Sequence, residues 1–201
     1  MTQQPPALEF ANRFQHTKYM VRRKLFTLLG RKFHVYDEAG NLAFYSYMKA
    51  FKLKEDIRLY TGEDMQTELL RIKARQIIDF SAAYDVEDAV TGEKVGALRR
   101  RGLKSILRDE WLILDPADRE IGRIREDSMV LALVRRFLTN LVPQHYTATL
   151  GDTPAGDYRQ HFNPFILKLD VDFTKDAQGK LDRRLALAAA ILLCAIEGRQ
   201  Q

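Results

Sequence analysis

The densest cationic cluster of the chain is Arg99-Arg100-Arg101, which Lys104 follows at a short distance. Guanidinium groups bind phosphate oxygens in pairs, and backbone N–H groups at a strand end add further donors. We therefore take this cluster as a candidate site for the phosphate of a headgroup. The alternative interpretation is a solvated hairpin whose charges discourage pairing with the edge of another sheet.

A second basic segment contains Lys49, Lys52 and Lys54, with Phe51 and Leu53 between them. Each cation close to an anionic membrane surface adds about 1 kcal/mol to the attraction. The segment is thus a second candidate for contact with such a surface, and a polar loop beside a strand is its alternative. Both assignments rest on charge alone.

Catalytic and metal-binding patterns do not emerge from the sequence. Ser105 has no identifiable base beside it, and the four histidines are scattered without the spacing of metal ligands. The aspartates between residues 170 and 182 suggest a calcium loop, but an EF-hand needs glycine at its sixth position, where this chain has Lys175. We therefore expect a protein that is not an enzyme and that binds neither cofactor nor metal.

The elements that position these residues are predicted best at the end of the chain. The apolar run Leu185–Ile196 makes about 18 Å of helix, which is shorter than the roughly 30 Å hydrocarbon core of a bilayer. A helix that is apolar on every side must be enclosed by protein if lipid is excluded. We expect the upstream strands to enclose it as a closed antiparallel β-barrel, a mainly β fold. The side chains expected to fill the barrel are Leu185, Leu187, Ile191, Leu192, Cys194 and Ile196.

Short strand-like runs separated by turn residues predict these strands, among them Leu42–Lys49, Ile77–Phe80 and Lys94–Arg100. In the run Phe165–Phe173 every second residue is apolar, which predicts one dry face and one wet face. An amphipathic helix is predicted near residues 128–142; it packs against the barrel or lies in a membrane interface. Residues 1–16 are expected to form a loose lead-in and residues 17–198 a single domain.

Composition limits the ligands and the cellular compartment of the protein only weakly. The formal net charge of +5 and a sequence pI near 9.3 permit contact with phosphates without requiring it. The single cysteine excludes a disulfide within the chain and favours a reducing compartment. Because neither a signal peptide nor a run of 18 apolar residues is present, we expect a cytoplasmic protein, peripheral to the inner membrane surface at most.

Several short motifs, taken in order, resemble the tubby C-terminal-like superfamily, in particular bacterial LURP-one-related and phospholipid scramblase-like proteins. They are Gly92–Gly96, Arg99–Arg101, Ser105, Trp111, Glu120–Gly122 and Arg125–Asp127. The ending, Leu167–Val171 followed by Asp182-Arg183-Arg184 and the apolar helix, is similar to that of scramblases. The resemblance implies a closed barrel threaded by a hydrophobic C-terminal helix.

For activity, the resemblance implies binding of phosphoinositide headgroups, as in tubby-like domains, or calcium-dependent lipid movement, as in scramblases. The chain departs from scramblases at Tyr158–Pro164, where their acidic segment is replaced by residues without a carboxylate, and it lacks their cysteine cluster. We therefore do not expect calcium-dependent scrambling.

Our expectation is a binding or scaffold module that docks on anionic phospholipid headgroups. A barrel that binds nucleic acid, with Tyr45 and Tyr47 stacking on bases, is the alternative, as is a protein-interaction role with an unidentified partner.

Overall fold

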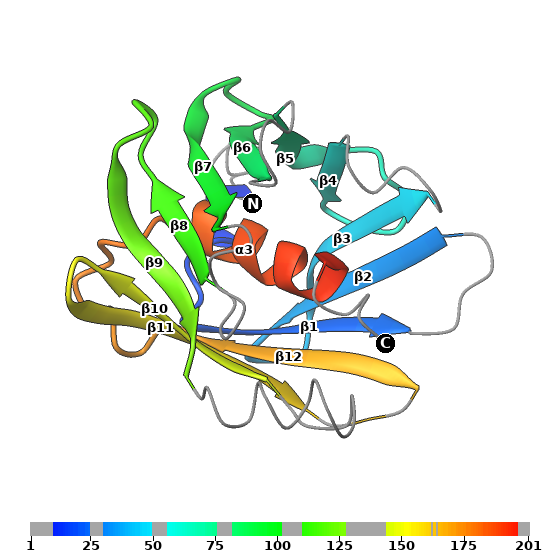
Figure 1. The fold of residues 1–201 in the computed structure, drawn as a ribbon. Coiled ribbons are helices and arrows are strands. Elements are labelled where there is room, and N and C mark those ends of the chain that lie inside the picture. The colour runs from blue at the N-terminus through cyan, green and yellow to red at the C-terminus, as the bar shows by residue number, and fades with distance from the viewer. Residues whose placement is uncertain are drawn as a thin grey trace, which may run out of the picture.

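The structure is a computed structural model that describes residues 10–24, 30–49, 56–75, 82–101, 110–127, 144–161, 163 and 165–196. Within these residues, twelve antiparallel strands close a barrel around helix α3, Arg183–Ile196 (Figure 1). The predicted fold class is therefore confirmed. The strands are β1 (Lys18–Lys24), β2 (Gly30–Asp37), β3 (Leu42–Lys49), β4 (Asp56–Tyr60), β5 (Glu68–Ala74), β6 (Ala83–Asp88), β7 (Lys94–Arg100), β8 (Glu110–Leu114), β9 (Glu120–Glu126), β10 (His145–Leu150), β11 (Thr153–His161) and β12 (Ile166–Asp172).

The barrel is a meander in which each strand pairs with the next along the chain. Closure comes from β1 and β12, where Lys18 lies opposite Asp172 and Lys24 lies opposite Ile166. All other pairings join strands that follow one another along the chain, as antiparallel pairing allows. The bounds of β3 and β7 coincide with those of the strand-like runs predicted from the sequence.

Helix α3 fills the barrel, and every residue from Leu185 to Ala195 is buried. Ile196, also predicted to fill the barrel, is partly buried at the end of the helix. The fit between helix and wall is closest at Gly96 of β7. A Cβ atom there would overlap the carbonyl oxygen of Leu114 and lie 3.0 Å from Cδ1 of Leu185. Only glycine leaves the helix this room.

Both ends of α3 are capped. At its start, the carboxylate of Asp182 accepts a hydrogen bond of 2.8 Å from the backbone N–H of Arg184. At its end, Nη1 of Arg23 donates to the carbonyl oxygen of Cys194 at 2.7 Å, and Nη1 of Arg31 donates to that of Ala195 at 2.8 Å. Arg23 is only 3% exposed, so its charge faces the negative end of the helix dipole in a nearly dry setting.

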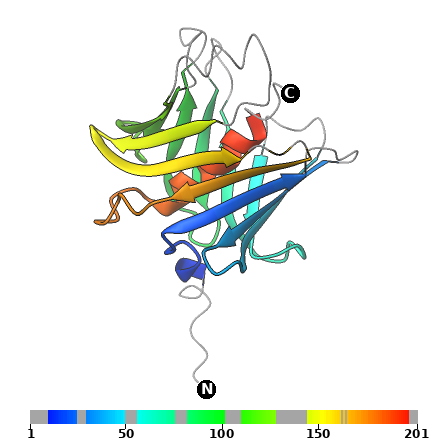
Figure 2. The ribbon, with the colours of Figure 1, turned by 90° about the horizontal axis from the view of Figure 1, so that it is seen from below.

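The two ends of the barrel are named here after the helix: α3 begins at the proximal end and finishes at the distal end. Figure 2 shows the helical turn that begins at Phe10, in dark blue, below and the last turn of α3, in red, above. Arg184 contacts Asp88 and Glu93, so the turn between β6 and β7 lies at the proximal end. Strand β7 therefore runs from the proximal end to the distal end, where Arg100 lies.

The inner face of β12 is made by Leu167, Leu169 and Val171, as the alternation predicts, with Phe173 directly after the strand. Phe165 was predicted on the same dry face, and this is wrong, because it is 68% exposed. The side chain of Asn163 accepts the backbone N–H groups of Phe165 and Ile166 at 2.9 and 3.0 Å. That turn directs Phe165 away before the strand begins.

The described residues test only some of the other predictions. The strand-like run Ile77–Phe80 and the amphipathic helix near residues 128–142 lie outside the described residues. The lead-in predicted for residues 1–16 is described from Phe10 on, and there the ring of Phe14 lies 4.7 Å from that of Phe44. Among the described residues, no helix has the length and hydrophobicity needed to cross a bilayer.

Candidate functional site: an arginine face on β7–β9

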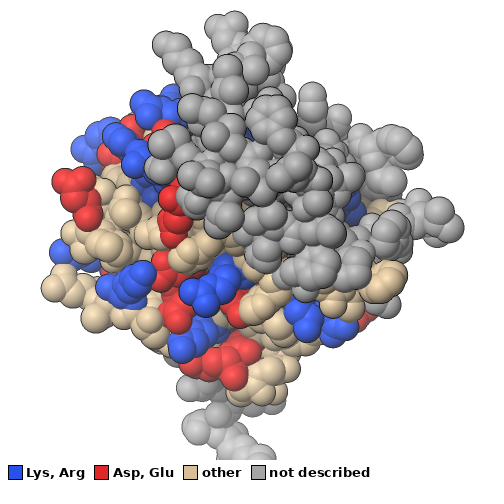
Figure 3. Space-filling view, turned by 60° about the horizontal axis from the view of Figure 1, so that its bottom comes forward, with Lys and Arg blue, Asp and Glu red and all other residues tan. Residues whose placement is uncertain are grey.

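Most charged side chains on the outer wall are paired with one another. On β4 and β5, Arg58 contacts Asp56 at 2.6 Å and Glu68 at 3.1 Å, while Arg71 contacts Glu68 at 2.7 Å. Figure 3 shows the same mixture on one side of the molecule, where basic and acidic side chains lie among each other. Neighbouring opposite charges cancel at a distance, so these parts of the wall attract anions weakly.

Strands β7–β9 carry a different arrangement, which we call the arginine face: Arg99, Arg101, Arg123 and Arg125. In the strand register, Arg99 lies opposite Leu112, which lies opposite Arg123 on the far side. One step toward the distal end, the backbone N–H of Arg101 donates to the carbonyl oxygen of Glu110, and Glu110 lies opposite Arg125. With strands about 4.8 Å apart, the paired arginines have Cα atoms only about 10 Å from each other.

The alternation of the strands turns all four side chains outward. Arg99 and Arg101 are exposed, and the side chains of Arg123 and Arg125 are 43% and 47% exposed. Between them, Leu112 is 4% exposed and packs with Ala97 and Leu114 in a small outer cluster. Four long cations therefore surround a dry apolar centre.

Glu110 sits within this face and is 8% exposed. It accepts a hydrogen bond of 3.0 Å from Nη1 of Arg101 and one of 2.8 Å from Nη2 of Arg125. Burial raises the pKa of this carboxyl group, but the two guanidinium groups outweigh burial and hold the pKa below its usual range. The carboxylate is thus ionised at neutral pH and orients two of the four arginines.

The other two arginines differ in their partners. Nε of Arg123 contacts Oε1 of Glu120 at 2.6 Å. The side chain of Arg99 forms no hydrogen bond or ion pair with any residue in the part of the chain that the structure describes. Among the described residues, the carboxylates that act on these four arginines are Glu110, Glu120 and, at longer range, Asp152 beside Arg123, so the arginines outnumber them. Arg99 supplies the guanidinium that is ready to bind an anion.

The triplet predicted from the sequence does not act as one cluster. Arg100 lies opposite Trp111 in the register, and the Trp111 side chain is 2% exposed in the core. Arg100 therefore projects to the opposite side of the sheet from Arg99 and Arg101. Lys104, Lys52 and Lys54 lie outside the described residues, and the side chain of Lys49, at the end of β3, is likewise not described.

Arg123 and Arg125 were not predicted as part of this site. They lie more than twenty residues from Arg99, and the register of two hairpins brings them together. Their alternation around Ile124 indicates a strand with two cations on one face, which was the only signal the sequence offered.

The tyrosines proposed to stack on bases do not form a platform beside this face. Tyr45 was predicted at the surface, and this is wrong: it is 3% exposed and packs edge-on against His34, with ring centroids 5.2 Å apart. Tyr45 and Tyr47 both belong to β3, which is four strands away from β7 in the barrel.

The aspartates that suggested a calcium loop have local partners instead. Asp172 accepts from the hydroxyl and N–H of Thr174, and Asp176 accepts from two backbone N–H groups and from Arg183. Within the described ranges, no three His, Cys, Asp or Glu side chains gather in a way that would hold a metal ion.

Comparison with known proteins gave no match: no family model, curated protein or solved structure aligns significantly with this chain.

Proposed function

We propose that this chain is a non-enzymatic binding module that docks on anionic phospholipid headgroups through the arginine face, at the cytoplasmic surface of a membrane. The observation that carries the proposal is Arg99, exposed and without an ionic partner among the described residues, beside three further arginines. The motifs that resemble LURP-one-related and scramblase-like proteins point in the same direction, and they include Arg99–Arg101 and Arg125.

The mechanism is charge-assisted hydrogen bonding to phosphate oxygens. Arg99 binds in a forked geometry, and its neighbours add attraction that extends over roughly 8 Å at physiological salt. Glu110 keeps Arg101 and Arg125 in fixed orientations, so little side-chain entropy is lost when a headgroup binds. The rigid barrel holds all four side chains in register.

Lipid is favoured over nucleic acid by what the arginine face lacks. Binding of single-stranded nucleic acid requires aromatic side chains on which bases stack. None of the described outward-facing residues that lie opposite or between the four arginines is aromatic; they include Ala83, Ala97, Glu110, Leu112, Leu114, Glu120, Thr147 and Thr149.

Vesicle pelleting tests the proposal, with phosphatidylcholine vesicles compared with vesicles that also contain phosphatidylglycerol. We expect binding only to the anionic vesicles, and weaker binding as salt is raised. The double variant Arg99→Gln/Arg123→Gln should bind about 10- to 30-fold more weakly, since each cation contributes about 1 kcal/mol.

The matched control is Lys18→Gln/Lys175→Gln, which removes the same charge from two exposed lysines on other parts of the surface. This control should change binding less than about threefold. Equal losses in both double variants would refute a defined site, and tighter binding to an oligonucleotide than to anionic vesicles would favour the nucleic-acid alternative.

Removing a negative charge from the arginine face should have the opposite effect on vesicle binding. Glu110→Gln removes the negative charge between Arg101 and Arg125 but keeps an amide oxygen that accepts a hydrogen bond from one of them. The gain in positive charge should outweigh the looser orientation and strengthen binding to anionic vesicles several-fold. Unchanged or weaker binding in a variant that still folds would contradict the role given to this face.

A further inference from the structure

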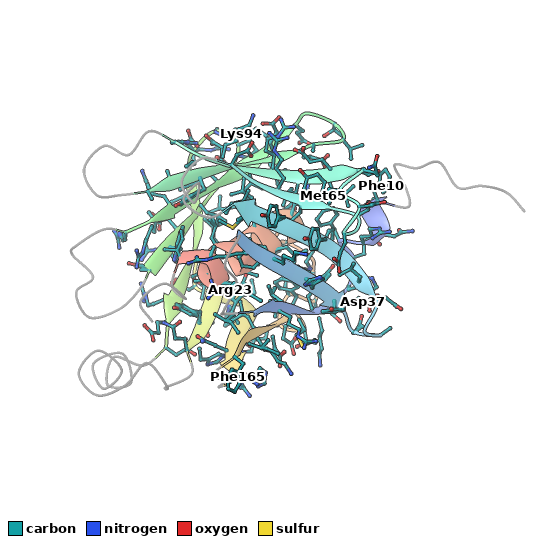
Figure 4. The ribbon with its side chains drawn as sticks, turned by 90° about the vertical axis from the view of Figure 1, so that its right-hand side faces the viewer. Phe10, Arg23, Asp37, Met65, Lys94 and Phe165 are labelled. Carbon is teal, nitrogen blue, oxygen red and sulfur yellow. The ribbon has the colours of Figure 1, made fainter. Side chains whose placement is uncertain are left out.

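A cavity of about 480 Å³ opens at the proximal end of the barrel, beside the start of α3. Its apolar lining includes Phe10 and Phe14 from the N-terminal segment, Leu69 of β5 and Leu181, which precedes α3. Figure 4 shows Phe10 and Asp37 toward this end, whereas Arg23 lies beside α3 toward the distal end. The volume falls in the range of small-molecule sites, about 300–1,000 Å³.

The charged residues at the cavity neutralise one another. Arg184 contacts Asp182 at 2.7 Å and Asp88 at 2.9 Å, and Arg183 contacts Asp176 at 2.7 Å. The lining itself holds two acids, Asp88 and Asp182, and two bases, Arg183 and Arg184, so its charges balance in number and most of the cavity suits an apolar chain.

One polar group at the cavity retains capacity to bind. Nη1 of Arg183 donates to Asp176 and to the carbonyl oxygen of Leu181, and the guanidinium stacks on the ring of Phe173 at 4.4 Å. Its Nε and Nη2 atoms donate no hydrogen bond to any described residue. The side chain is 15% exposed, so its position is fixed while these donors stay available to an oxygen atom.

We propose that this cavity binds the aliphatic chain of a single-chain amphiphile, with an oxygen atom of its head accepting hydrogen bonds from Arg183. The apolar lining suits the aliphatic chain of the ligand, and the balanced charges of the wall match the absence of charge along that chain. Arg183 offers donors to the acceptor oxygen at one end. The site does not depend on the arginine face, since it lies at the opposite end of the barrel from Arg101. A fatty-acid carboxylate and a glycerol ester share the required chemistry.

Titration calorimetry with dodecanoate, kept below its micelle concentration, tests the site. We expect saturable one-to-one binding with a negative heat-capacity change, the mark of buried apolar surface. Dodecyltrimethylammonium has the same chain with a cationic head that accepts no hydrogen bond, and it should bind at least about tenfold more weakly. The glycerol monoester of dodecanoate shows whether the natural head is an acid or a neutral ester.

Two neighbouring tryptophan substitutions locate the binding. Ala11 and Asn12 are both exposed in the same helical turn, but only Ala11 lines the cavity. Ala11→Trp should fill part of the cavity and weaken dodecanoate binding about tenfold or more, whereas Asn12→Trp should leave affinity within about twofold. Thermal melting by circular dichroism verifies that both variants fold.

Absence of saturable binding by both dodecanoate and its glycerol monoester would overturn the proposal. Equal effects of Ala11→Trp and Asn12→Trp would refute the location of the site. Equal affinity for dodecanoate and dodecyltrimethylammonium would refute the role of Arg183.

Discussion

Gly96 is the point at which the enclosure of α3 can be tested most directly, through the substitution Gly96→Ala. The new Cβ would overlap the carbonyl oxygen of Leu114, which is backbone and cannot move aside cheaply, and would lie 3.0 and 3.2 Å from the two terminal carbons of Leu185. The backbone of Gly96 also has φ +154°, a conformation that L-residues rarely adopt.

Two costs therefore add. A non-glycine residue at positive φ costs about 1–3 kcal/mol, and overpacking a filled core costs about 1–3 kcal/mol more. Gly92→Ala is the matched control, because Gly92 also has positive φ, +73°, but a Cβ there meets nothing within 4 Å. We expect Gly96→Ala to lower the free energy of unfolding by about 2–6 kcal/mol, against about 1–2 kcal/mol for Gly92→Ala.

Urea unfolding followed by the fluorescence of Trp111, the single and buried tryptophan, measures both values. A second test adds Leu185→Ala. Removing the crowded Leu185 carbons should relieve part of the Gly96→Ala cost, so the double variant should be more stable than the sum of the single changes by about 0.5–3 kcal/mol. If Gly96→Ala and Gly92→Ala cost the same within about 0.5 kcal/mol, the close packing around Gly96 is wrong, and additive effects of Gly96→Ala and Leu185→Ala would refute its contact with α3.

Two further predictions concern single side chains. Cys194 is 1% exposed, and its burial raises the pKa of the thiol to about 12. The thiol should therefore not react with a thiol reagent in the native protein, whereas it should react fully in the urea-unfolded chain. Rapid labelling of the native protein would contradict the enclosed helix. Burial alone would raise the pKa of Asp176, but hydrogen bonds from Leu181, Arg183 and Lys180 lower it below its usual value, so the carboxylate stabilises the fold above about pH 4 and this contribution is lost as pH falls through the lowered pKa. Asp176→Asn should therefore lower the free energy of unfolding, measured by urea titration, by about 1–3 kcal/mol at neutral pH and by much less near pH 2. An equal loss at both pH values would refute the stabilising role of the ionised Asp176 carboxylate.

The architecture was predictable from the sequence to the extent that its signals are local. The run from Leu185 to Ile196 has no polar side on which to face water, and its length argues against insertion in a bilayer, so an enclosed helix was the favoured outcome. Strand-like runs bounded by turn residues likewise predicted β3 and β7 to the residue. Strands β10 and β11 were not predicted, because Thr147, Thr149 and Asp157 interrupt their apolar pattern with polar outer positions and the turn at Gly151 is short.

The site was predictable only in part, since it depends on long-range register. Arg99 and Arg101 were identified from local charge density, but the outward direction of these two and the inward direction of Arg100 follow from strand alternation. Arg123 joined the site through the pairing of β8 with β9, which no local pattern reveals. Phe165 shows the converse error: the alternation of β12 was extended past a turn that Asn163 creates with its side chain.

The pairing of β1 with β12 and the late position of α3 have a consequence for how the chain acquires its shape during synthesis. The first strand, β1, leaves the ribosome about 150 residues before its partner β12. The apolar inner faces of the strands stay uncovered until α3 has been synthesised. Contacts this distant in sequence form slowly, and exposed apolar strands attract other chains in the meantime. Nascent copies of this protein therefore depend on rapid completion or on chaperones that shield the unfilled shell.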